Sequence, residues 1–506
     1  MRPSNAWLVV LAASIAFRLP PLINAAGTHS DAAVVGLQAM HLLRGEWSPF
    51  LWGSGYQTSV DAMVAALGFL FTGPSAVTLM ASSLAGHIVL TWLCFDALRP
   101  KLGDWRAAVV VGPLVFAPDP VHTYVLYPPR QASLTLVFLA FWLTHGALSS
   151  RRPLLRLGAG GAVSTLALWA DPYALLFLPA QALMAALVLA PLRADRGRLS
   201  RSIGAFVAGA SVGVIPYRLI QTHPLASRGQ TSLTLDVFDR NWKLLLDPCL
   251  PWLLSIKVHA ARSMSDYQPW DGGPALRGLQ ILGAAALVMA VLSGGALVFA
   301  RKIPWEIRRL GLVGVFMIPI TIGGFLISPM VMDHFSTRYL AALILTAPFA
   351  MAPLAHLLRG RRFGLWLTPY LISGAISGWV SYRPFGLGVH PSLGVDARLG
   401  DELRRRGIRY AMADYWASYR LTLFYRENPV IVPKNEVEDR YRPYRRAFEA
   451  EPRVAYIHDA YRSREKLGEM EAAIQKGETP FEVVYERFGE ANFTVLVLMR
   501  RRAGDR

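Results

Sequence analysis

The chain has 506 residues, of which 53% are hydrophobic, and a formal net charge of +18 at pH 7. Its mean hydropathy of +0.33 exceeds what a single soluble core uses. The apolar residues fall into runs of roughly 18 to 25, about the length of a helix that crosses a lipid bilayer. This composition excludes an ordinary soluble fold.

The basic surplus lies mostly in the apolar part of the chain. Residues 383–506 hold 23 Lys and Arg against 19 Asp and Glu, which leaves 29 against 15 for residues 1–382. No basic strip with interleaved aromatic residues is present, so nucleic acid is not a predicted partner. The two cysteines, Cys94 and Cys249, give neither a disulfide framework nor a metal-binding spacing.

The apolar runs predict a polytopic α-helical membrane protein with about eleven spans. In chain order the spans are residues 6–26, 75–98, 107–118, 131–149, 155–170, 173–190, 203–219, 277–300, 310–328, 339–357 and 364–382. A cleaved signal peptide over the first run is an alternative that leaves the later loops in place.

Every second connection between spans is basic, which labels it as cytoplasmic. The basic residues are Arg99, Lys101, Arg106, Arg151, Arg152, Arg156, Arg193, Arg196, Arg198, Arg201, Arg301, Lys302, Arg308, Arg309, Arg359, Arg361 and Arg362. The alternate loops 119–129 and 329–337 contain no Lys or Arg. This pattern predicts a multi-pass membrane protein with a cytoplasmic N-terminus. The large excess of Arg over Lys favours a bacterial genome, and hence a bacterial inner (plasma) membrane. Loops 27–74 and 220–276 and the segment 383–506 are then extracytoplasmic.

The first external loop, residues 27–74, is longer than a structureless connector usually is. Apolar residues recur at helical spacing from Asp31 to Leu43, and Ser30 or Asp31 is a suitable N-cap. A second helix is predicted from Ser59 to Phe71, with Asp61 in its first turn. We expect the first of these helices to lie in the membrane interface with its apolar face down.

The tail changes character after Pro384. Short β-rich runs at residues 408–412, 430–432 and 454–457 alternate with helical patterns such as residues 462–476. The alternation predicts that residues 383–506 form a small extracytoplasmic α/β domain with a partly parallel sheet. Residues 1–382 form the membrane module.

Three stretches resemble GT-C membrane glycosyltransferases, in particular the family 39-like enzymes related to protein O-mannosyltransferases and aminoarabinose transferases. The first external loop is similar over residues 30–46 and 50–62, which read SDAAVVGLQAMHLLRGE and FLWGSGYQTSVDA. Ser336 to Leu340 resembles the Arg-Tyr-Leu start of a late span in that family, and Ala413 to Leu421 resembles a signature of its C-terminal tails.

The resemblance implies inverting transfer of one sugar from a polyprenyl-phosphate donor to an acceptor outside the cytoplasm, which is a lipid, a glycan or a protein. Asp31 matches the family's general base. In the commonest family pattern a second acid follows that Asp directly, but Ala32 stands there in this chain. A site with two carboxylates would therefore need Asp61.

The chemistry of such a transfer also selects residues without the family. The acceptor hydroxyl needs a carboxylate within hydrogen-bond reach, and Asp31 lies just outside the first span. The leaving phosphate is stabilised by fixed cations. The candidates at the outer ends of spans are Arg18, Arg130 and Arg338, because ionisable groups at lipid depth tend to mark substrate paths.

Substrate-binding candidates are Trp52, Tyr56, Tyr127, Asp171 and Tyr339, most of which offer an aromatic ring to a sugar face. No cofactor is required by this chemistry. A divalent metal is left open, and Asp31, Asp61, Asp333 and His334 are the residues that would hold it.

Each candidate also has a purely structural interpretation. Asp31 can serve as an N-cap, Asp61 as a first-turn residue that favours the helix dipole, and Asp171 as a turn former in Trp169 to Tyr173. The three arginines can reach up to lipid headgroups. Asp333 and His334 can belong to a solvated loop, and a single histidine such as His29 or His122 is weak evidence for a metal.

Two other functions remain open from the sequence. A flippase or transporter of lipid-linked saccharides is one, although paired halves with interrupted midplane helices are not evident. The other is a non-catalytic scaffold whose tail binds envelope partners. A nucleotide-binding loop and a nucleophile elbow are not recognisable, which argues against a cytosolic sugar donor and a serine hydrolase.

Overall fold

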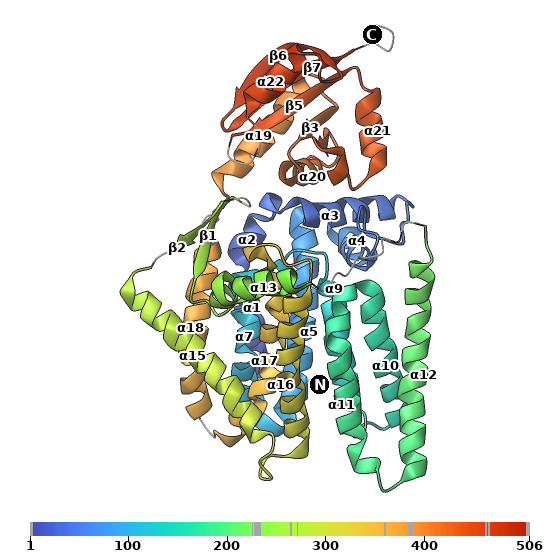
Figure 1. Ribbon diagram of the computed structural model, residues 1–506, viewed down its shortest axis with the longest axis vertical. Coiled ribbons are helices and arrows are strands. Elements are labelled where there is room, and N and C mark those ends of the chain that lie inside the picture. Colours follow the sequence, from blue (N-terminus) through green and yellow to red (C-terminus); the bar gives the residue numbers. More distant parts are fainter. Residues whose placement is uncertain are drawn as a thin grey trace.

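The computed structural model describes residues 4–501, except 225, 227–233, 264–265, 271, 359–360, 383–387, 461–462 and 464–465. The molecule has two layers (Figure 1). A tall bundle of helices from the first three quarters of the chain lies below, and a smaller domain with a five-stranded sheet lies above it. A mostly helical chain with a small C-terminal sheet region is therefore confirmed.

Helices overlap all eleven predicted spans. They are α1 (Asn5–Ala16), α2 (Leu19–Ile23), α5 (Ala76–Leu102), α6 (Asp104–Val110), α7 (Gly112–Val115), α9 (Gln131–His145), α10 (Pro153–Ala170), α11 (Leu178–Leu189), α12 (Arg196–Gln221), α15 (Pro274–Leu297), α16 (Trp305–Ile327), α17 (Ala341–Leu357) and α18 (Arg362–Tyr382). Within the described residues, six helical segments are long and apolar enough to cross a membrane by length and composition. The count of eleven spans stays a prediction.

Two of the predicted spans are each divided into two helices beside a proline. In the span predicted at residues 6–26, α1 ends at Ala16 and α2 begins at Leu19, directly before Pro20. In the span predicted at residues 107–118, α6 ends at Val110 and α7 begins directly before Pro113. Proline fits the first turn of a helix, where its missing N–H is not needed, and in both spans it stands in the first turn of the second helix.

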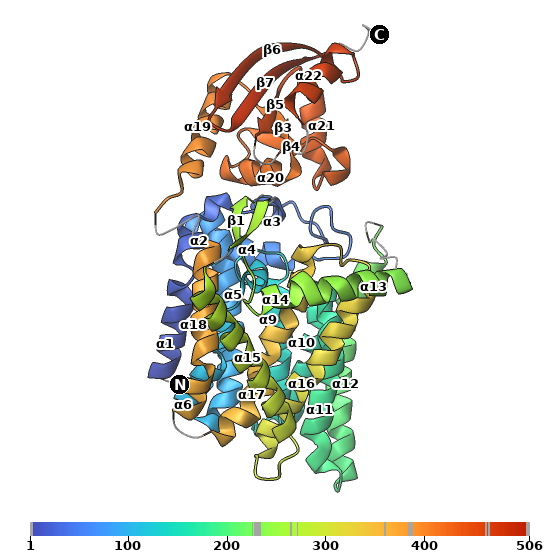
Figure 2. The ribbon, with the colours of Figure 1, turned by 60° about the vertical axis from the view of Figure 1, so that its left-hand side comes forward.

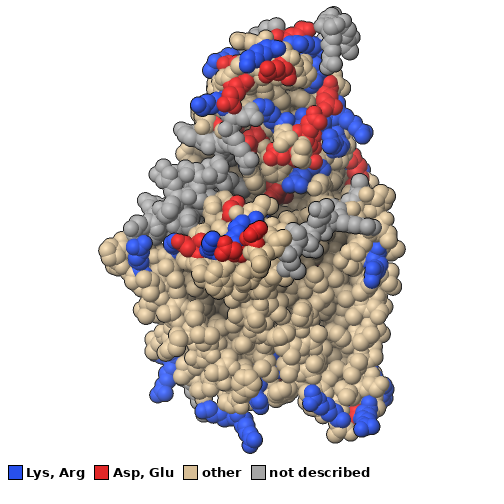
Figure 3. Space-filling view, viewed as in Figure 1, with Lys and Arg blue, Asp and Glu red and all other residues tan. Residues whose placement is uncertain are grey.

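The charges are distributed unevenly along the bundle. Figure 3 shows Lys and Arg at its lower end, a broad uncharged band above them, and a mixture of both signs on the upper domain. The predicted basic loop between α11 and α12 lies at this lower end (Figure 1). The uncharged band suits a lipid environment, and the basic lower end fits the predicted cytoplasmic side.

The first external loop contains the two predicted helices, α3 (Ser30–Leu43) and α4 (Val60–Thr72). Neither predicted N-cap of α3 is correct, because His29 caps the helix by accepting the Ala32 N–H at 3.2 Å. The predicted single apolar face of α3 is also wrong. The helix lies flat between the bundle and the upper domain (Figures 1 and 2), and every residue from Ala32 to His41 is buried.

The remaining loops of the bundle are also structured. Loop 119–129 contains α8 (Asp119–Val125), and the loop before α17 contains the 3₁₀ helix η5 (His334–Leu340). Loop 220–276 contains α13 (Leu235–Leu244), α14 (Leu250–Leu253) and an antiparallel hairpin of β1 (Val258–Ser263) and β2 (Asp266–Trp270). Further short helices are η1 (Ala25–Gly27), η2 (Pro172–Phe177), η3 (Ala190–Leu192) and η4 (Leu245–Cys249).

The upper domain is built on a sheet of strand order β4-β3-β5-β7-β6. Its elements are α19 (Pro391–Arg405), β3 (Tyr410–Ala413), α20 (Tyr415–Phe424), β4 (Val430–Pro433), η6 (Glu436–Glu438), α21 (Arg442–Ala450), β5 (Arg453–Asp459), α22 (Leu467–Gln475), β6 (Phe481–Glu490) and β7 (Phe493–Arg500). Strand β3 is parallel to β4 and β5, whereas β7 is antiparallel to β5 and β6. The predicted partly parallel sheet is confirmed, and the three predicted strands fall on β3, β4 and β5. The predicted helix 462–476 falls on α22, and part of its first turn lies outside the described residues.

The hydrophobic core has two main parts that meet at α3. One lies inside the bundle, where Phe138, Phe141 and Phe349 contact one another. The other joins the first external loop to the upper domain, since residues of α3 and α4 pack in one cluster with Tyr419 of α20 and Leu496 of β7. The first loop is therefore held between the two layers, where it forms the floor of the site described next.

Candidate active site

A cavity of about 220 Å³ lies where the first external loop, the turn before α9, η5 and the upper domain meet. It brings together seven of the residues predicted from the sequence, namely Asp31, Trp52, Tyr56, Tyr127, Arg130, Arg338 and Tyr339. It is also lined by His29, Tyr124, Tyr415 and Arg440. The cavity therefore contains a carboxylate, three guanidinium groups and several aromatic rings within one enclosed space.

Asp31 lies in the first turn of α3, and about a third of its side chain is exposed. Its Oδ1 accepts a short hydrogen bond from the hydroxyl of Tyr415. The Nη2 of Arg440 lies 3.9 Å from the same oxygen. The second carboxylate oxygen has no hydrogen bond within the described part of the chain, so it is available to accept a proton from a bound hydroxyl.

Arg130 is fixed by a buried ion pair. Its Nε donates to Oδ2 of Asp171 at 2.9 Å, and its Nη1 donates to the hydroxyl of Tyr124 at 2.9 Å. Oδ2 of Asp171 also accepts from Nε2 of Gln57 at 2.6 Å, and Oδ1 accepts the N–H of Tyr173 at 2.7 Å. Asp171, predicted as a substrate-binding residue, does not line the cavity; its contacts orient the guanidinium of Arg130, which does.

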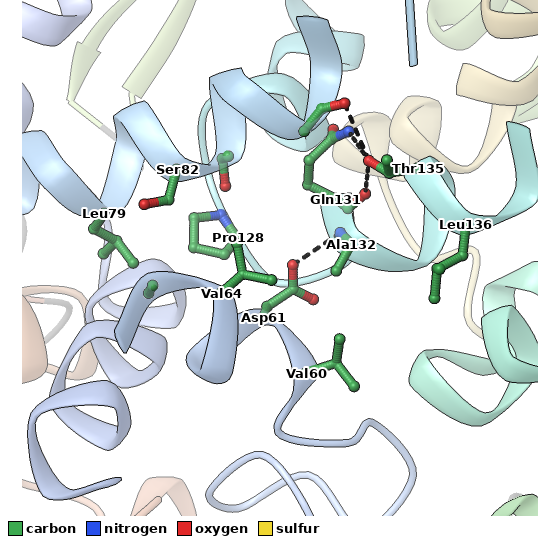
Figure 4. A pocket seen from close by; sticks show the side chains of 13 residues that line it. Val60, Asp61, Val64, Leu79, Ser82, Pro128, Gln131, Ala132, Thr135 and Leu136 are labelled. Atoms are coloured by element: carbon green, nitrogen blue, oxygen red, sulfur yellow. Dashed lines mark hydrogen bonds between the residues drawn. The ribbon is translucent and has the colours of Figure 1, made fainter. Parts of the chain in front are cut away.

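The backbone of Arg130 adopts a conformation that non-glycine residues rarely take, with φ of 110°. Asp61 holds it there, since its Oδ2 accepts the N–H of Arg130 at 2.8 Å and its Oδ1 accepts the N–H of Ala132 at 3.0 Å. The interaction with Ala132 is drawn in Figure 4. Strained residues of this kind concentrate at functional sites, where the surrounding structure holds them.

Asp61, predicted as a possible second acid, is therefore not brought together with Asp31. It lies beside a different, mostly apolar cavity of about 300 Å³ between α4, α5 and α9, which is shown in Figure 4. Both carboxylate oxygens are occupied by backbone N–H groups. Asp61 thus acts on the site through the position of Arg130.

Arg338 is the cation that lacks a counter-ion in the cavity. No carboxylate lies within 4.0 Å of it among the described residues, and its Nε–H has no hydrogen-bond partner there. Its only hydrogen bond within that part of the chain runs from Nη2 to the hydroxyl of Tyr339 at 3.5 Å. A half-buried and unpaired guanidinium is costly unless an anion reaches it. Arg338 therefore favours an anionic ligand.

The predicted aromatic residues lie around these charges. Trp52 stacks on Tyr441 of the upper domain with ring centroids 3.9 Å apart, and Tyr127 contacts the ring of His29 at 4.9 Å. Tyr56 lines the cavity and is 45% exposed, so part of its side chain is open to a ligand. Tyr339 sends its ring toward Arg130, whose Cζ lies 6.0 Å from the ring centroid.

His29 is held as the neutral imidazole. Burial lowers its pKa, and Arg338 acts in the same direction, while Asp31 opposes both. Because Nδ1 accepts the N–H of Ala32, the ring proton of the neutral form is on Nε2. His29 therefore offers a hydrogen-bond donor to this cavity and not an additional positive charge.

The structure places Arg18 away from the cavity, inside the bundle. It is fully buried, and its guanidinium donates to the backbone carbonyls of Ser14 at 3.0 Å and Leu114 at 3.1 Å. The chain turns inward between α1 and α2, so Arg18 joins the end of α1 to α7 instead of facing outward. Its contacts are those of a structural cation.

Asp333 and His334 also lie outside the lining of the cavity. Asp333 caps the start of η5, where its backbone N–H also donates to Oγ of Ser336 at 3.4 Å. The ring of His334 packs between Trp252 and Phe335. Among the described residues, no group of three or more His, Cys, Asp or Glu is arranged to hold a metal ion.

Comparison with solved structures finds membrane glycosyltransferases of the GT-C superfamily. ArnT from Cupriavidus metallidurans in the apo state is 11% identical, with 97% of each chain covered and a TM-score of 0.48. The oligosaccharyltransferase of Archaeoglobus fulgidus is 10% identical over 90% of this chain and 68% of its own, with a TM-score of 0.47. The arabinofuranosyltransferase AftD from mycobacteria is 15% identical over 82% of this chain and 30% of its own, with a TM-score of 0.41.

No protein-family profile matches the sequence. No curated protein matches it either. The structural likenesses are loose at these scores and decide neither the family nor the activity of this chain.

Several residues of the cavity were not predicted from the sequence. Gln57 belongs to the stretch of the first loop that resembles the family, but no role was assigned to it, and its contact to Asp171 depends on how that loop packs against the start of η2. Tyr124 carries no motif, although it lies only six residues before Arg130. Tyr415 belongs to the tail stretch that resembles the family, but no role was assigned to it. Arg440 gave no signal in the sequence, because it lies in a charged segment of the upper domain, far along the chain from Asp31.

Proposed function

We propose that this chain is an inverting glycosyltransferase that moves one sugar from a polyprenyl-phosphate donor to a hydroxyl acceptor on the extracytoplasmic side of a bacterial inner membrane. The single observation that carries the proposal is the cavity itself. Three groups line it together: the carboxylate of Asp31 and the guanidinium of Arg338, which have respectively one oxygen without a hydrogen bond and no counter-ion within the described part of the chain, and the oriented guanidinium of Arg130.

The charges of the cavity suit a phosphate-linked sugar. Among the residues that the structure describes, Arg338 has no counter-ion and Arg130 has only Asp171, so an anion that bridges the two guanidinium groups neutralises charge that is otherwise buried. As the glycosidic bond breaks, negative charge grows on the phosphate, and fixed guanidinium groups stabilise that charge better than mobile water does. Asp31 then takes the proton of the acceptor hydroxyl as the new bond forms.

The surroundings of the cavity suit a lipid carrier. Pro128 lines both this cavity and the apolar cavity beside Asp61, so an apolar chain that leaves the phosphate has an adjoining apolar space between α4, α5 and α9. Tyr56, Tyr127 and Tyr339 offer rings on which a sugar face can stack. Neither the apolar space nor the tyrosine rings select among a lipid, a glycan and a protein as the acceptor.

The resemblance of residues 30–46 and 50–62 to the first periplasmic loop of GT-C enzymes supports the same assignment, with Asp31 at the matching position. We propose no required cofactor, because Arg130 and Arg338 supply the positive charge that a divalent metal would otherwise provide. The orientation proposed here rests on the basic residues at the lower end of the bundle (Figure 3), whereas α3, which contributes Asp31 to the cavity, lies at its upper end (Figure 1).

Mass spectrometry of envelope lipids, glycans and proteins from a deletion strain tests this function. We expect one sugar to be missing from one class of envelope molecule, and a plasmid that carries the intact chain to restore it. A flippase gives a different pattern. In its absence the lipid-linked sugar is trapped on the inner leaflet of the membrane, and the purified protein forms no new glycosidic bond. An unchanged envelope composition would contradict both activities.

A further inference from the structure

The upper domain reaches into the cavity at Asp31. We infer that this domain completes the active site by supplying Tyr415 and Arg440, which position the carboxylate of Asp31. The inference rests on the proposed function and goes beyond it, since it assigns a role in the reaction to the C-terminal domain. Tyr415 and Arg440 are positioning residues here, because they act on substrate through Asp31.

A relay of hydrogen bonds connects the two residues to the carboxylate. Nε of Arg440 donates to the hydroxyl oxygen of Tyr415 at 3.2 Å, and that hydroxyl donates to Oδ1 of Asp31. The guanidinium polarises the hydroxyl, which strengthens its donation to the carboxylate. With Oδ1 occupied in this way, the rotation of the carboxylate is fixed and the other oxygen is left for an acceptor hydroxyl.

The start of α20 is fixed against the start of α3. Oγ of Ser30 donates to the backbone carbonyl of Tyr415 at 2.5 Å and accepts the backbone N–H of Arg420 at 3.3 Å. Asp414 caps α20 by accepting the N–H of Trp416 at 3.1 Å. The two bonds of Ser30 connect residues that are 385 and 390 positions apart, and they hold Tyr415 beside Asp31, the residue that follows Ser30.

Arg440 is fixed against the first loop in a comparable way. Its Nη1 donates to the carbonyl of Gly53 at 3.0 Å, and its backbone N–H donates to the hydroxyl of Tyr419 at 2.6 Å. Gly53 has φ of 67°, and a Cβ added there would lie 2.9 Å from the Cα of Arg440. Only glycine fits both the backbone conformation and the close approach of the domain.

A second polar cluster, centred on the covered side chains of His41 and Glu427, anchors the domain further along α3. Nε2 of His41 lies 2.6 Å from Oε1 of Glu427, and Nδ1 lies 2.8 Å from Oε2 of Glu46. Arg44 and the hydroxyl of Tyr444 also contact Glu427, each at 2.5 Å. The upper domain is therefore attached to both ends of α3. The placement of Tyr415 and Arg440 beside Asp31 thus does not depend on a single hydrogen bond.

The experiment measures how readily Asp31 binds a proton, without any sugar donor. Dicyclohexylcarbodiimide adds to a protonated carboxyl group and leaves a stable N-acylurea, so the fraction of Asp31 labelled in purified full-length protein at each pH is read by peptide mass spectrometry. Removing a hydrogen bond to the carboxylate favours its protonated form. We expect Tyr415→Phe to move the pH of half-maximal labelling upward by about one unit, a tenfold change in proton affinity.

The matched control is Tyr425→Phe, which removes the hydrogen bond from another tyrosine hydroxyl of the same domain to the carbonyl of Asp396 at 2.8 Å, away from the cavity. We expect its labelling curve to overlay that of the wild type. Arg440→Gln provides a second variant if Tyr415→Phe does not fold, and it shifts the curve in the same direction. Curves for Tyr415→Phe and Arg440→Gln that overlay the wild type would overturn the inference. Because labelling needs no glycosyl transfer, this result is independent of whether the proposed function holds.

Discussion

Replacing Asp171 with asparagine separates two roles of Arg130: its structural role in the ion pair with Asp171 and its proposed role in binding the donor phosphate. Asp171 is 2% exposed and receives three hydrogen bonds, from Gln57, Arg130 and Tyr173. Asparagine has the same shape but no charge, and its amide nitrogen has to face one of these donors. The guanidinium of Arg130, with 13% of its side chain exposed, then loses its counter-ion.

The magnitude follows from the burial of the pair. Removing one partner of a buried ion pair costs about 3–5 kcal/mol, and we take the lower end because asparagine keeps an acceptor and Arg130 borders a cavity. A loss of about 3 kcal/mol lowers the melting temperature by on the order of 5 °C for a chain of this size. The change is read by thermal unfolding of the purified protein in detergent.

The informative step adds undecaprenyl phosphate. A phosphate that binds beside Arg130 replaces the missing negative charge, so the ligand raises the melting temperature of Asp171→Asn more than that of the wild type. The control is Asp96→Asn, which breaks a partly buried pair with Arg99 at the opposite end of the bundle. It also loses stability, but the ligand stabilises it only as much as the wild type. Equal ligand-induced shifts in Asp171→Asn and wild type would refute the placement of phosphate at Arg130.

Two further predictions follow from other charges. Arg338→Ala removes a guanidinium that we expect to bind the donor phosphate, and a hydrogen bond to a charged group contributes about 1.5–3 kcal/mol. Undecaprenyl phosphate should therefore bind about 10- to 100-fold more weakly to this variant, as measured by titration in native mass spectrometry. Arg201→Ala, an exposed arginine at the basic end, should leave that affinity unchanged. The contact between α3 and the upper domain should depend on pH. Burial opposes ionisation of Glu427, but hydrogen bonds from His41, Tyr444 and Arg44 outweigh it and lower its pKa to about 2. Its contribution to stability is therefore present above its ordinary pKa and is lost as pH falls from about 4.5 toward 2. Burial alone would lower the pKa of His41, but its interactions with Glu427 and Glu46 outweigh burial, and the net pKa is raised. The contribution of His41 to stability is therefore present below its ordinary pKa and is lost as pH rises through the raised value. Limited proteolysis at a series of pH values should find the upper domain most protected from cleavage between these two limits. Glu427→Gln should remove the loss of protection on the acid side. Identical pH profiles for wild type and Glu427→Gln would contradict the role of Glu427 in this contact.

Apolar runs and basic connections were sufficient to predict the helical bundle, because span length and loop charge are local properties of the chain. The same holds for the candidates of the site that lie beside helix starts. Asp31, Arg130 and Arg338 each occupy such a position, and all three line one cavity. Arg18 also stands beside the start of a helix. Its side chain nevertheless lies inside the bundle, because α1 ends before it and its guanidinium donates back to the carbonyl of Ser14.

The contacts between segments could not be predicted from one sequence. Asp61 looked like a second acid in the first loop, but it binds the backbone of Arg130, which is 69 residues away. The hydroxyl of Tyr415 reaches Asp31 across 384 residues. No periodicity or spacing encodes such pairings, which depend on how the upper domain is placed on α3.

Transfer by the Asp31→Asn variant tests the central claim most directly. Asparagine keeps the size of the side chain but cannot accept the proton of the acceptor, so the variant should accumulate in the membrane, bind undecaprenyl phosphate, and fail to restore the missing envelope sugar in the deletion strain. Asp236→Asn, which changes an exposed first-turn carboxylate of α13 in the other large external loop, should restore it fully. Full restoration by Asp31→Asn would show that this carboxylate is not the base.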